Sequence, residues 1–183
     1  MPTKKPQASD VGQEGAPAPI LVGLGANLPS PAHGPPRATL QTALAHLERR
    51  GLRLGRRSRW YESAPVPVAD QPWFVNGVVE IFTALGAPPL LELLHAVERD
   101  FGRFRGALNA PRTLDLDLIA YGDVVRDREP PILPHPRMAE RAFVLLPLRE
   151  VAPDWRHPVS GLSVEEMIRA LPPGQTIRLA GEG

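Results

Sequence analysis

The hydrophobic pattern of the first half of the chain alternates between strand-like and helix-like periods. The apolar run at residues 20–24 leads into Gly25, which predicts a buried strand that enters a loop. Apolar residues at helical spacing over residues 40–47 predict a helix that begins near Ala38 and ends at Gly51. The chain therefore starts as a strand, a loop and a helix.

Two more strands are predicted after this helix. Residues 52–61 alternate apolar positions with arginines, which indicates one exposed strand. Residues 74–83 regain strand character through valine, isoleucine and phenylalanine side chains. Because prolines cannot donate ladder hydrogen bonds, the proline-rich residues 63–72 between the two strands are predicted to form a loop.

The second half of the chain contributes helices and one further strand. Pro88-Pro89 suits a helix start, and an apolar stripe continues this helix to Gly102. A strand is predicted over residues 114–118, followed by helices over residues 143–148 and 163–171. Ser163 and Glu166 form the capping-box pattern at the start of the last helix.

The order of these elements is β-α-β-β-α-β with a C-terminal appendage. This order predicts an α+β fold of ferredoxin-like type, an antiparallel sheet with helices packed on it. Residues 1–19 contain too few large apolar residues to bury, and they predict a flexible N-terminal tail. Residues 20–183 are expected to form a single domain.

Composition and charge exclude several classes of protein. The 21 basic and 20 acidic residues leave a formal charge of +1, so no overall field favours a nucleic-acid or membrane partner. The chain has no cysteine, which excludes disulfides and thiolate metal sites. It shows neither a signal-peptide pattern nor an apolar run of the roughly 20 residues that span a bilayer. We therefore expect a cytoplasmic protein without nucleic-acid or membrane partners. A monomer is also expected.

The predicted strand at residues 114–118 carries the strongest chemical signal. Its leucines face one way, and Asp115 and Asp117 face the other. The Cα atoms of such a pair are about 7 Å apart, so both carboxylates can converge on the same cations. Mg²⁺ prefers hard oxygen ligands of this kind together with substrate phosphates. A solvated strand face is the alternative interpretation of the pair alone.

Arginines lie close to this acidic pair in the sequence. Arg103, Arg105 and Arg112 precede it, and guanidinium groups match phosphate oxygens bidentately. A polyphosphate clamp is therefore favoured, although the arginine-rich loop alone is equally consistent with a solvated surface. The segment Gly23-Leu24-Gly25 lacks the third glycine of a dinucleotide fingerprint, and close backbone packing accounts better for these glycines.

Aromatic and histidine side chains indicate a second part of the site. Phe74 and Phe143 could enclose a flat heterocycle, and Asn76 offers a donor and an acceptor to its edge. Core packing is the alternative for each phenylalanine. His135 stands between two prolines that stiffen its backbone, and an ordinary loop histidine is its alternative. With no paired histidine motif, a zinc site is not favoured.

Six segments, in this order and spacing, resemble those of the 6-hydroxymethyl-7,8-dihydropterin pyrophosphokinase family. Members of this family are enzymes of folate biosynthesis. The resemblance extends from Ile20 to about Leu171. The segments are Gly23-Leu24-Gly25-Ala26-Asn27-Leu28, Tyr61-Glu62-Ser63, Gln71-Pro72-Trp73-Phe74-Val75-Asn76, Pro111-Arg112-Thr113-Leu114-Asp115-Leu116-Asp117, Pro134-His135-Pro136-Arg137-Met138 and Glu140-Arg141-Ala142-Phe143-Val144-Leu145.

The resemblance implies transfer of pyrophosphate from ATP to the pterin hydroxymethyl group, which leaves AMP. It implies that Asp115 and Asp117 hold two Mg²⁺ ions and that Arg103 and Arg112 neutralise phosphate charge. The residues it implies for pterin binding are Ser63, Ala64, Val66, Phe74, Asn76 and Phe143. Those it implies for ATP binding are Glu98, Arg105, Arg112, His135 and Arg141. It also implies that loops near residues 27–37, 62–73 and 102–112 close over the substrates.

The sequence departs from the family pattern beside the acidic pair. Residues 107–110 read Ala-Leu-Asn-Ala where the family usually carries a basic residue, an aromatic and a glycine. Two rival functions share some of these features. The arginines of residues 49–59 could bind RNA, but an RNA-recognition sheet needs aromatics that residues 20–24 lack. A metal-dependent phosphohydrolase would share the carboxylates and release phosphate to water.

Overall fold

A computed structural model describes residues 18–65, 70–102 and 112–181 of the chain. In chain order its elements are β1 (Ile20–Ala26), α1 (Pro36–Arg49), β2 (Arg53–Arg57), β3 (Tyr61–Ser63), β4 (Phe74–Phe82), α2 (Ala87–Asp100), β5 (Asp115–Tyr121), the 3-10 helix η1 (Met138–Glu140), α3 (Ala142–Val151), α4 (Val164–Arg169) and β6 (Ile177–Leu179). The strand order is β5-β1-β4-β3-β6, β2 also pairs with β4, and every pairing is antiparallel. The predicted ferredoxin-like α+β fold is confirmed.

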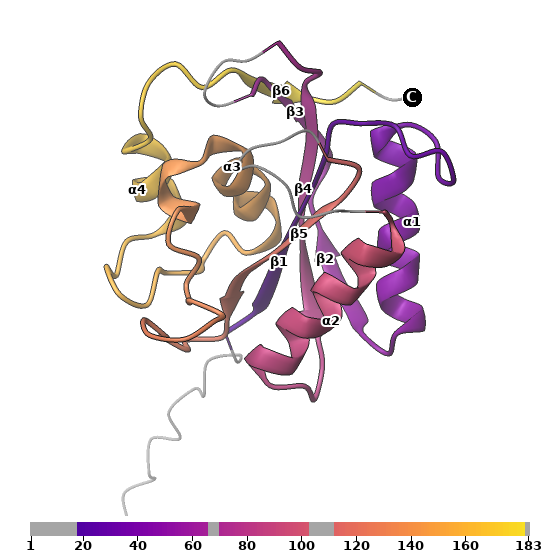
Figure 1. The fold of residues 1–183 in the computed structure, drawn as a ribbon. Helices are drawn as coiled ribbons and strands as arrows, with labels where there is room; N and C mark the ends of the chain where they lie inside the picture. Colours follow the sequence, from indigo (N-terminus) through magenta and orange to yellow (C-terminus); the bar gives the residue numbers. More distant parts are fainter. Residues whose placement is uncertain (1–17, 66–69, 103–111, 182–183) are drawn as a thin grey trace, which may run out of the picture.

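The sheet separates two layers of helices, which Figure 1 shows on its two sides. α1 and α2 cover one face, where the core includes Val22, Leu24 and Leu116. α3 and α4 cover part of the other face, where Leu21, Val78 and Ile119 belong to a second core. Because side chains alternate along each strand, neighbouring residues supply these two cores in turn. The face toward α3 is the one that carries the site described below.

The helix starts follow the signals that the sequence predicted. α1 and α2 each have proline in the first turn, where a missing N–H group costs no helical hydrogen bond. At the start of α4, Ser163 and Glu166 form the reciprocal bonds of a capping box. Within the described residues, no helix combines the length and the apolar character that crossing a membrane requires.

The prediction of one strand over residues 52–61 is wrong, because the chain is interrupted between β2 and β3. Both backbone and side chain of Ser58 bond Val78: its N–H donates to the Val78 carbonyl and its Oγ accepts from the Val78 N–H, each at 3.0 Å. The indole of Trp60 lies against Gly77, where an added Cβ would be only 2.7 Å from Cζ3. The local alternation of residues gives no sign of this cross-strand irregularity.

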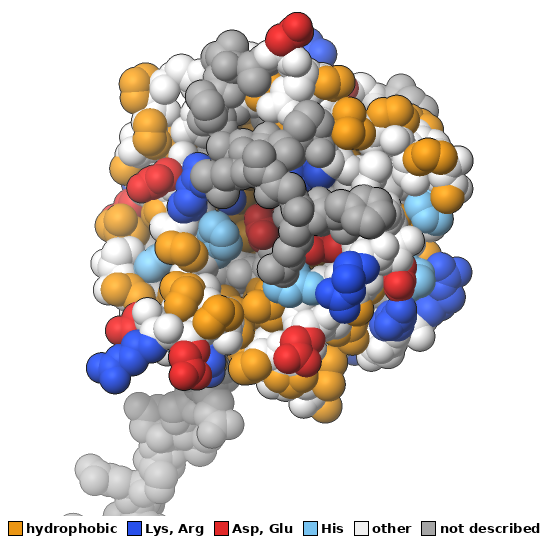
Figure 2. Space-filling model, viewed as in Figure 1, with side chains coloured by type: hydrophobic (Ala, Val, Ile, Leu, Met, Phe, Trp, Pro, Cys, Tyr) orange, Lys and Arg blue, Asp and Glu red, His pale blue; other side chains and the backbone are white. Residues whose placement is uncertain are grey.

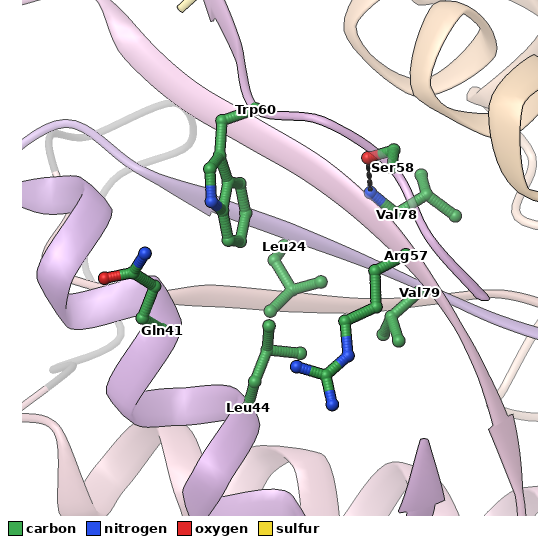
Figure 3. Close-up of a pocket in the computed structure, with 8 residues that line it drawn as sticks. All are labelled: Leu24, Gln41, Leu44, Arg57, Ser58, Trp60, Val78 and Val79. Atoms are coloured by element: carbon green, nitrogen blue, oxygen red, sulfur yellow. Dashed lines mark hydrogen bonds between the residues drawn. The ribbon is translucent and has the colours of Figure 1, made fainter. Parts of the chain in front are cut away.

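A small pocket lies beside this interruption, on the α1 side of the sheet. Figure 3 shows Trp60 from the β2–β3 connection, Gln41 and Leu44 from α1, and Leu24 from β1 lining it. Its remaining lining residues are Arg57, Ser58, Val78 and Val79. The pocket is therefore separated by the sheet from the acidic residues of β5.

Candidate active site

The predicted acidic pair lies on β5, with its two side chains on the face toward α3. Leu116 and Leu118 point into the α1–α2 core, and Asp115 and Asp117 alternate with them. The side chains of Asp115 and Asp117 are 18% and 38% exposed, so both keep access to a ligand. The predicted two-faced strand is confirmed.

Glycines of β1 stand directly beside these carboxylates. The β1–β5 register pairs Gly25 with Asp115 and Gly23 with Asp117, and the β1–β4 register pairs Gly25 with Asn76. A Cβ added to Gly25 would lie 3.3 Å from Asn76 Oδ1 and 3.8 Å from Asp115 Cβ. The absence of a side chain at Gly25 therefore leaves the sheet bare between the amide and the carboxylate.

Two of the predicted arginines reach the acidic pair from opposite sides. Arg112, just before β5, forms an ion pair with Asp115 through Nη1 and Oδ2. Arg141, at the N-cap of α3, places Nη1 3.8 Å from Asp117 Oδ2. Burial lowers the pKa of Arg141 and the charge of Arg137 lowers it further, while the two carboxylates act in the opposite direction. Cations thus line both flanks of the pair, as a polyphosphate site requires.

His135 joins the same cluster from the loop that follows β5. Its backbone N–H donates to the Ile119 carbonyl at 2.8 Å, which fixes the loop to the end of the strand. Burial, followed by the charges of Arg141 and Arg137, lowers the pKa of His135 to about 4. Its Nδ1 accepts the Arg137 backbone N–H at 3.2 Å. The neutral ring therefore has Nε2–H as its donor at physiological pH.

Four of the predicted pterin-binding residues lie around the end of β3 and the start of β4: Ser63, Ala64, Phe74 and Asn76. The amide nitrogen of Asn76, a residue only 4% exposed, donates to Ser63 Oγ at 2.9 Å. Phe74 lies at the start of β4, opposite Ser63 in the register, and shares the strand face of Asn76. Ala64 follows β3 directly. The amide of Asn76 is thus held in one orientation beside the bare segment of β1.

Phe143 lies in the first turn of α3, beside the arginine that pairs with β5. The guanidinium carbon of Arg141 is 5.4 Å from the centroid of the Phe143 ring. The ring is partly buried and packs against the α3 core. α3 therefore brings one predicted aromatic residue and one predicted phosphate ligand to the same edge of the site.

Glu98 takes a position different from that of the other predicted ligands. It is buried near the end of α2, on the opposite side of the sheet, and its Oε1 accepts the Leu116 backbone N–H at 2.7 Å. Leu116 lies between the two aspartates, so this bond supports the backbone that carries them. The predicted site residues Val66, Arg103 and Arg105 lie outside the described residues.

Asn27 is a site residue that was not predicted from the sequence. The residue is 1% exposed, and its side chain connects three segments. Oδ1 accepts the Arg112 N–H at 2.8 Å, and Nδ2 donates to Gln71 Oε1 and to the Pro72 carbonyl, each at 3.2 Å. A polar residue directly after a buried strand was the available signal, because a buried amide must find partners.

The site offers a suitable donor set for Mg²⁺ once substrate phosphates are counted. Asp115 and Asp117 are hard oxygen donors on one strand face, and Mg²⁺ usually takes one or two carboxylates plus phosphate oxygens. Within the described ranges no group of three or more His, Cys, Asp or Glu side chains forms a metal cage. Two carboxylates match the number that Mg²⁺ takes from a protein when phosphate oxygens complete its shell.

Figure 2 shows the surface of the molecule in the same view as Figure 1, with β1 and β5 near the centre of that view. Acidic, basic and histidine side chains gather there in one area of the surface. Most of the remaining described surface on this face is a mixture of neutral and hydrophobic side chains.

Comparison with known proteins identifies the family. The family model described as 7,8-dihydro-6-hydroxymethylpterin-pyrophosphokinase (HPPK) matches residues 21–153. A 2-amino-4-hydroxy-6-hydroxymethyldihydropteridine pyrophosphokinase of Synechocystis sp. is 44% identical over 149 residues, which are 81% of this chain and 73% of that protein. The protein of the same name from Pseudomonas aeruginosa is 42% identical over 163 residues, which are 88% of this chain and 97% of that protein.

A solved structure supports the fold independently of close sequence similarity. The crystal structure of Plasmodium falciparum HPPK-DHPS matches with a TM-score of 0.62 at 14% identity. The match covers 87% of this chain and 42% of that one. Together with the family match over residues 21–153, these findings show that the chain belongs to the 7,8-dihydro-6-hydroxymethylpterin-pyrophosphokinase family.

Proposed function

We propose that the chain performs the reaction of its family at the row formed by Asn76, Gly25 and Asp115. The reaction transfers the pyrophosphoryl group of ATP to the hydroxymethyl oxygen of 6-hydroxymethyl-7,8-dihydropterin in folate biosynthesis, and AMP is released. The row is the observation that carries this placement: a held amide and a carboxylate flank a glycine with no side chain between them. An acceptor read by Asn76 would thus lie next to the phosphate site.

Asp115 and Asp117 are the proposed Mg²⁺ ligands, for two ions. The metal would supply positive charge that polarises the phosphates and the attacking hydroxyl. Arg112 pairs with Asp115 and Arg141 with Asp117, and a guanidinium fork matches phosphate oxygens bidentately. The cations thus orient the triphosphate and compensate its charge during transfer.

The nucleotide and pterin roles divide along the same row. Neutral His135 offers a hydrogen-bond donor on the ATP side, and proposed roles there also belong to Arg103 and Arg105. Glu98 acts on this side indirectly, through its hydrogen bond to the backbone between the two aspartates. On the pterin side, Phe74 and Phe143 enclose the ring, and Asn76 reads its edge with Ser63, Ala64 and Val66. The Ser63 hydroxyl contributes by holding the Asn76 amide in one orientation. A monomer is the proposed working form.

The product of the reaction tests this proposal directly. Purified protein with ATP, Mg²⁺ and 6-hydroxymethyl-7,8-dihydropterin is expected to form AMP and the pterin diphosphate in equal amounts, measured by chromatography. AMP formation should stop when the pterin is omitted or when the metal is removed with a chelator. Formation of ADP or free phosphate without AMP would contradict pyrophosphoryl transfer and would indicate the phosphohydrolase alternative.

The pterin enclosure has its own test in Phe143→Ala. Loss of one stacked ring should raise the Kd of the pterin by about tenfold, since an aromatic pair contributes around 1 kcal/mol beyond its buried area. The Kd of a non-hydrolysable ATP analogue should change by less than about twofold. Leu146→Ala, a partly buried α3 residue one turn further along, is the matched control. Equal weakening of both ligands would argue against the enclosure.

A further inference from the structure

The C-terminal residues 175–179 bond both walls of the proposed pterin site. This segment lies beyond residues 21–153, the part of the chain that the family model matches. It includes β6, which pairs with β3 and thereby lies at the edge of the sheet next to the acceptor residues. Figure 1 shows β6 beside β3, with α3 on the neighbouring side. The segment is therefore placed to influence acceptor binding.

Gln175 bonds the start of α3. Its Oε1 accepts the backbone N–H of Ala142 at 2.9 Å, and its Nε2 donates to the carbonyl of Glu140 at 3.0 Å. α3 has no capping bond from its own N-cap side chain, so Gln175 satisfies an N–H group that would otherwise lack a helical partner. The two bonds enclose Arg141 and fix the turn that presents Phe143.

Thr176 and Arg178 bond the opposite wall. The Thr176 carbonyl accepts the backbone N–H of Ala64 at 3.0 Å. The guanidinium of Arg178 lies 4.7 Å from the centroid of the Trp73 ring. Its Nε donates to Glu62 Oε2 at 2.8 Å. One arginine thus connects β3 to the residue immediately before Phe74.

These contacts come from separate residues of one short segment, but they all hold residues of the proposed pterin site. Gln175 acts on the side of Phe143, and Arg178 acts on the side of Phe74. An enclosure of two rings depends on the distance between them, because a misplacement of about 1 Å weakens a bound geometry strongly. A segment that bonds both sides sets that distance.

We propose that Gln175 and Arg178 are positioning residues for the pterin acceptor, which they serve by holding α3 and the segment before β4 at a fixed separation. The inference rests on the proposed function, because it takes Phe74 and Phe143 to enclose the pterin. The hydrogen bonds of Gln175 go to Ala142, Glu140 and Pro172, and that of Arg178 goes to Glu62. Their effect is therefore specific to the acceptor.

The test compares single variants by steady-state kinetics with AMP as the measured product. Gln175→Ala and Arg178→Ala are each expected to raise the KM for hydroxymethyldihydropterin about fivefold, the effect of one or two hydrogen bonds. The KM for ATP should stay within about twofold. Gln175→Glu keeps an acceptor for the Ala142 N–H and adds favourable charge at a helix start, so it should recover part of the loss.

Two control variants separate positioning from general stability. Arg156→Ala removes an exposed arginine that pairs with Glu166 of α4 at 3.8 Å and donates to the Gly161 carbonyl at 3.1 Å. Gln41→Ala removes an exposed glutamine of α1 that lines the pocket on the opposite side of the sheet. Both should keep the wild-type KM for the acceptor. Thermal unfolding of every variant then shows whether lost stability accompanies the kinetic change.

The possible outcomes are distinct. A selective rise in the KM for the acceptor, absent from the controls, supports the inference. If wild-type protein forms AMP but both variants keep its acceptor KM, or if the two KM values rise together, the inference is overturned and the proposed function stands. If wild-type protein forms no AMP, the proposed function is overturned and the inference with it.

Discussion

The two faces of the sheet are built from the same strands but differ in what they bury. Toward α1 and α2, strands β1, β4 and β5 present a continuous aliphatic surface that includes Leu24, Ile81 and Leu118. Toward α3, only one end of the same strands is aliphatic, with Val78 and Ile119. The other end carries carboxylates, an amide and glycines.

This difference shows where the chain uses its surface for stability and where it uses it for binding. Burying aliphatic area stabilises the fold by roughly 25 cal/mol per Å². The aliphatic residues of the α1–α2 face contribute in this way. The α3 face lacks this stabilisation at the end where Asp115, Asp117 and Asn76 lie, because polar side chains take the place of aliphatic ones there. A change on the first face should therefore alter stability, and a change at this end of the second should alter activity.

The largest effect is expected from Asp117→Asn. The carboxylate is a proposed metal ligand, and losing one charge-stabilising group of this kind costs about 100- to 1,000-fold in rate. The kcat for AMP formation should fall by at least that factor. The free energy of unfolding should change by less than about 1 kcal/mol, since the Asp117 pair with Arg141 is partly exposed.

Asp154→Asn is the matched control for Asp117→Asn. Asp154→Asn removes a carboxylate from an exposed position outside the strands and should leave kcat unchanged. Urea unfolding of both variants reports stability separately from rate. If Asp117→Asn lost several kcal/mol of stability and little activity, the acidic end of this face would have to be structural.

Gly25→Ala tests the bare row between the acceptor and phosphate sides. The new methyl group would lie 3.3 Å from Asn76 Oδ1, so the amide must shift by a few tenths of an ångström. We expect kcat/KM to fall about 10- to 100-fold because the reacting groups are displaced. Stability should be nearly unchanged, since alanine suits an extended strand. Normal activity would show that ligands do not approach this backbone.

Gly77→Ala makes the same chemical change on the other face. Gly77 pairs with Leu24, the neighbour of Gly25, and its added Cβ would be 2.7 Å from Trp60 Cζ3 and 2.9 Å from Cε3. Overpacking of this kind costs about 1–3 kcal/mol. The variant should therefore lose stability in a denaturant titration and keep its kcat per folded molecule. If Gly25→Ala lost stability and Gly77→Ala lost activity, the proposed difference between the two faces would be contradicted.

Much of this contrast could be predicted from local sequence pattern. The alternation of leucine and aspartate in residues 114–118 requires nothing beyond strand geometry, and the structure confirms it. The capping box at Ser163 is local in the same way. Features that depend on neighbours within one turn or one strand are therefore accessible to sequence reasoning.

The features that were missed depend on register and on distant contacts. Periodicity placed Gly25 in a packed backbone, and only the pairing with β4 and β5 shows that it separates Asn76 from Asp115. The bond of Gln175 to Ala142 spans 33 residues, and that of Asn27 to Arg112 spans 85. No local pattern encodes which strand or loop a side chain will meet.

The smallest effect concerns the end of α3 that lies away from the site. Glu150 accepts hydrogen bonds from Tyr61 Oη and from the Arg59 guanidinium, whose Nη2 is 2.7 Å from Oε1. Burial raises the pKa of Glu150, but these bonds outweigh burial and hold its pKa below the ordinary value of 4.5. The carboxylate therefore stabilises the fold above pH 4.5, and this stabilisation is lost as pH falls through the lowered pKa.

Glu150→Gln should accordingly reduce the free energy of unfolding by about 1 kcal/mol at pH 7, because a charged acceptor is replaced by a neutral one. The difference from wild type should shrink as the pH is lowered below 4.5, when the wild-type carboxyl is protonated as well. Both KM values should stay at the wild-type level, since this end of α3 anchors the helix and does not contact the acceptor. A difference in stability that is independent of pH would show that Glu150 acts through packing, and a raised acceptor KM would show that the two ends of α3 are coupled.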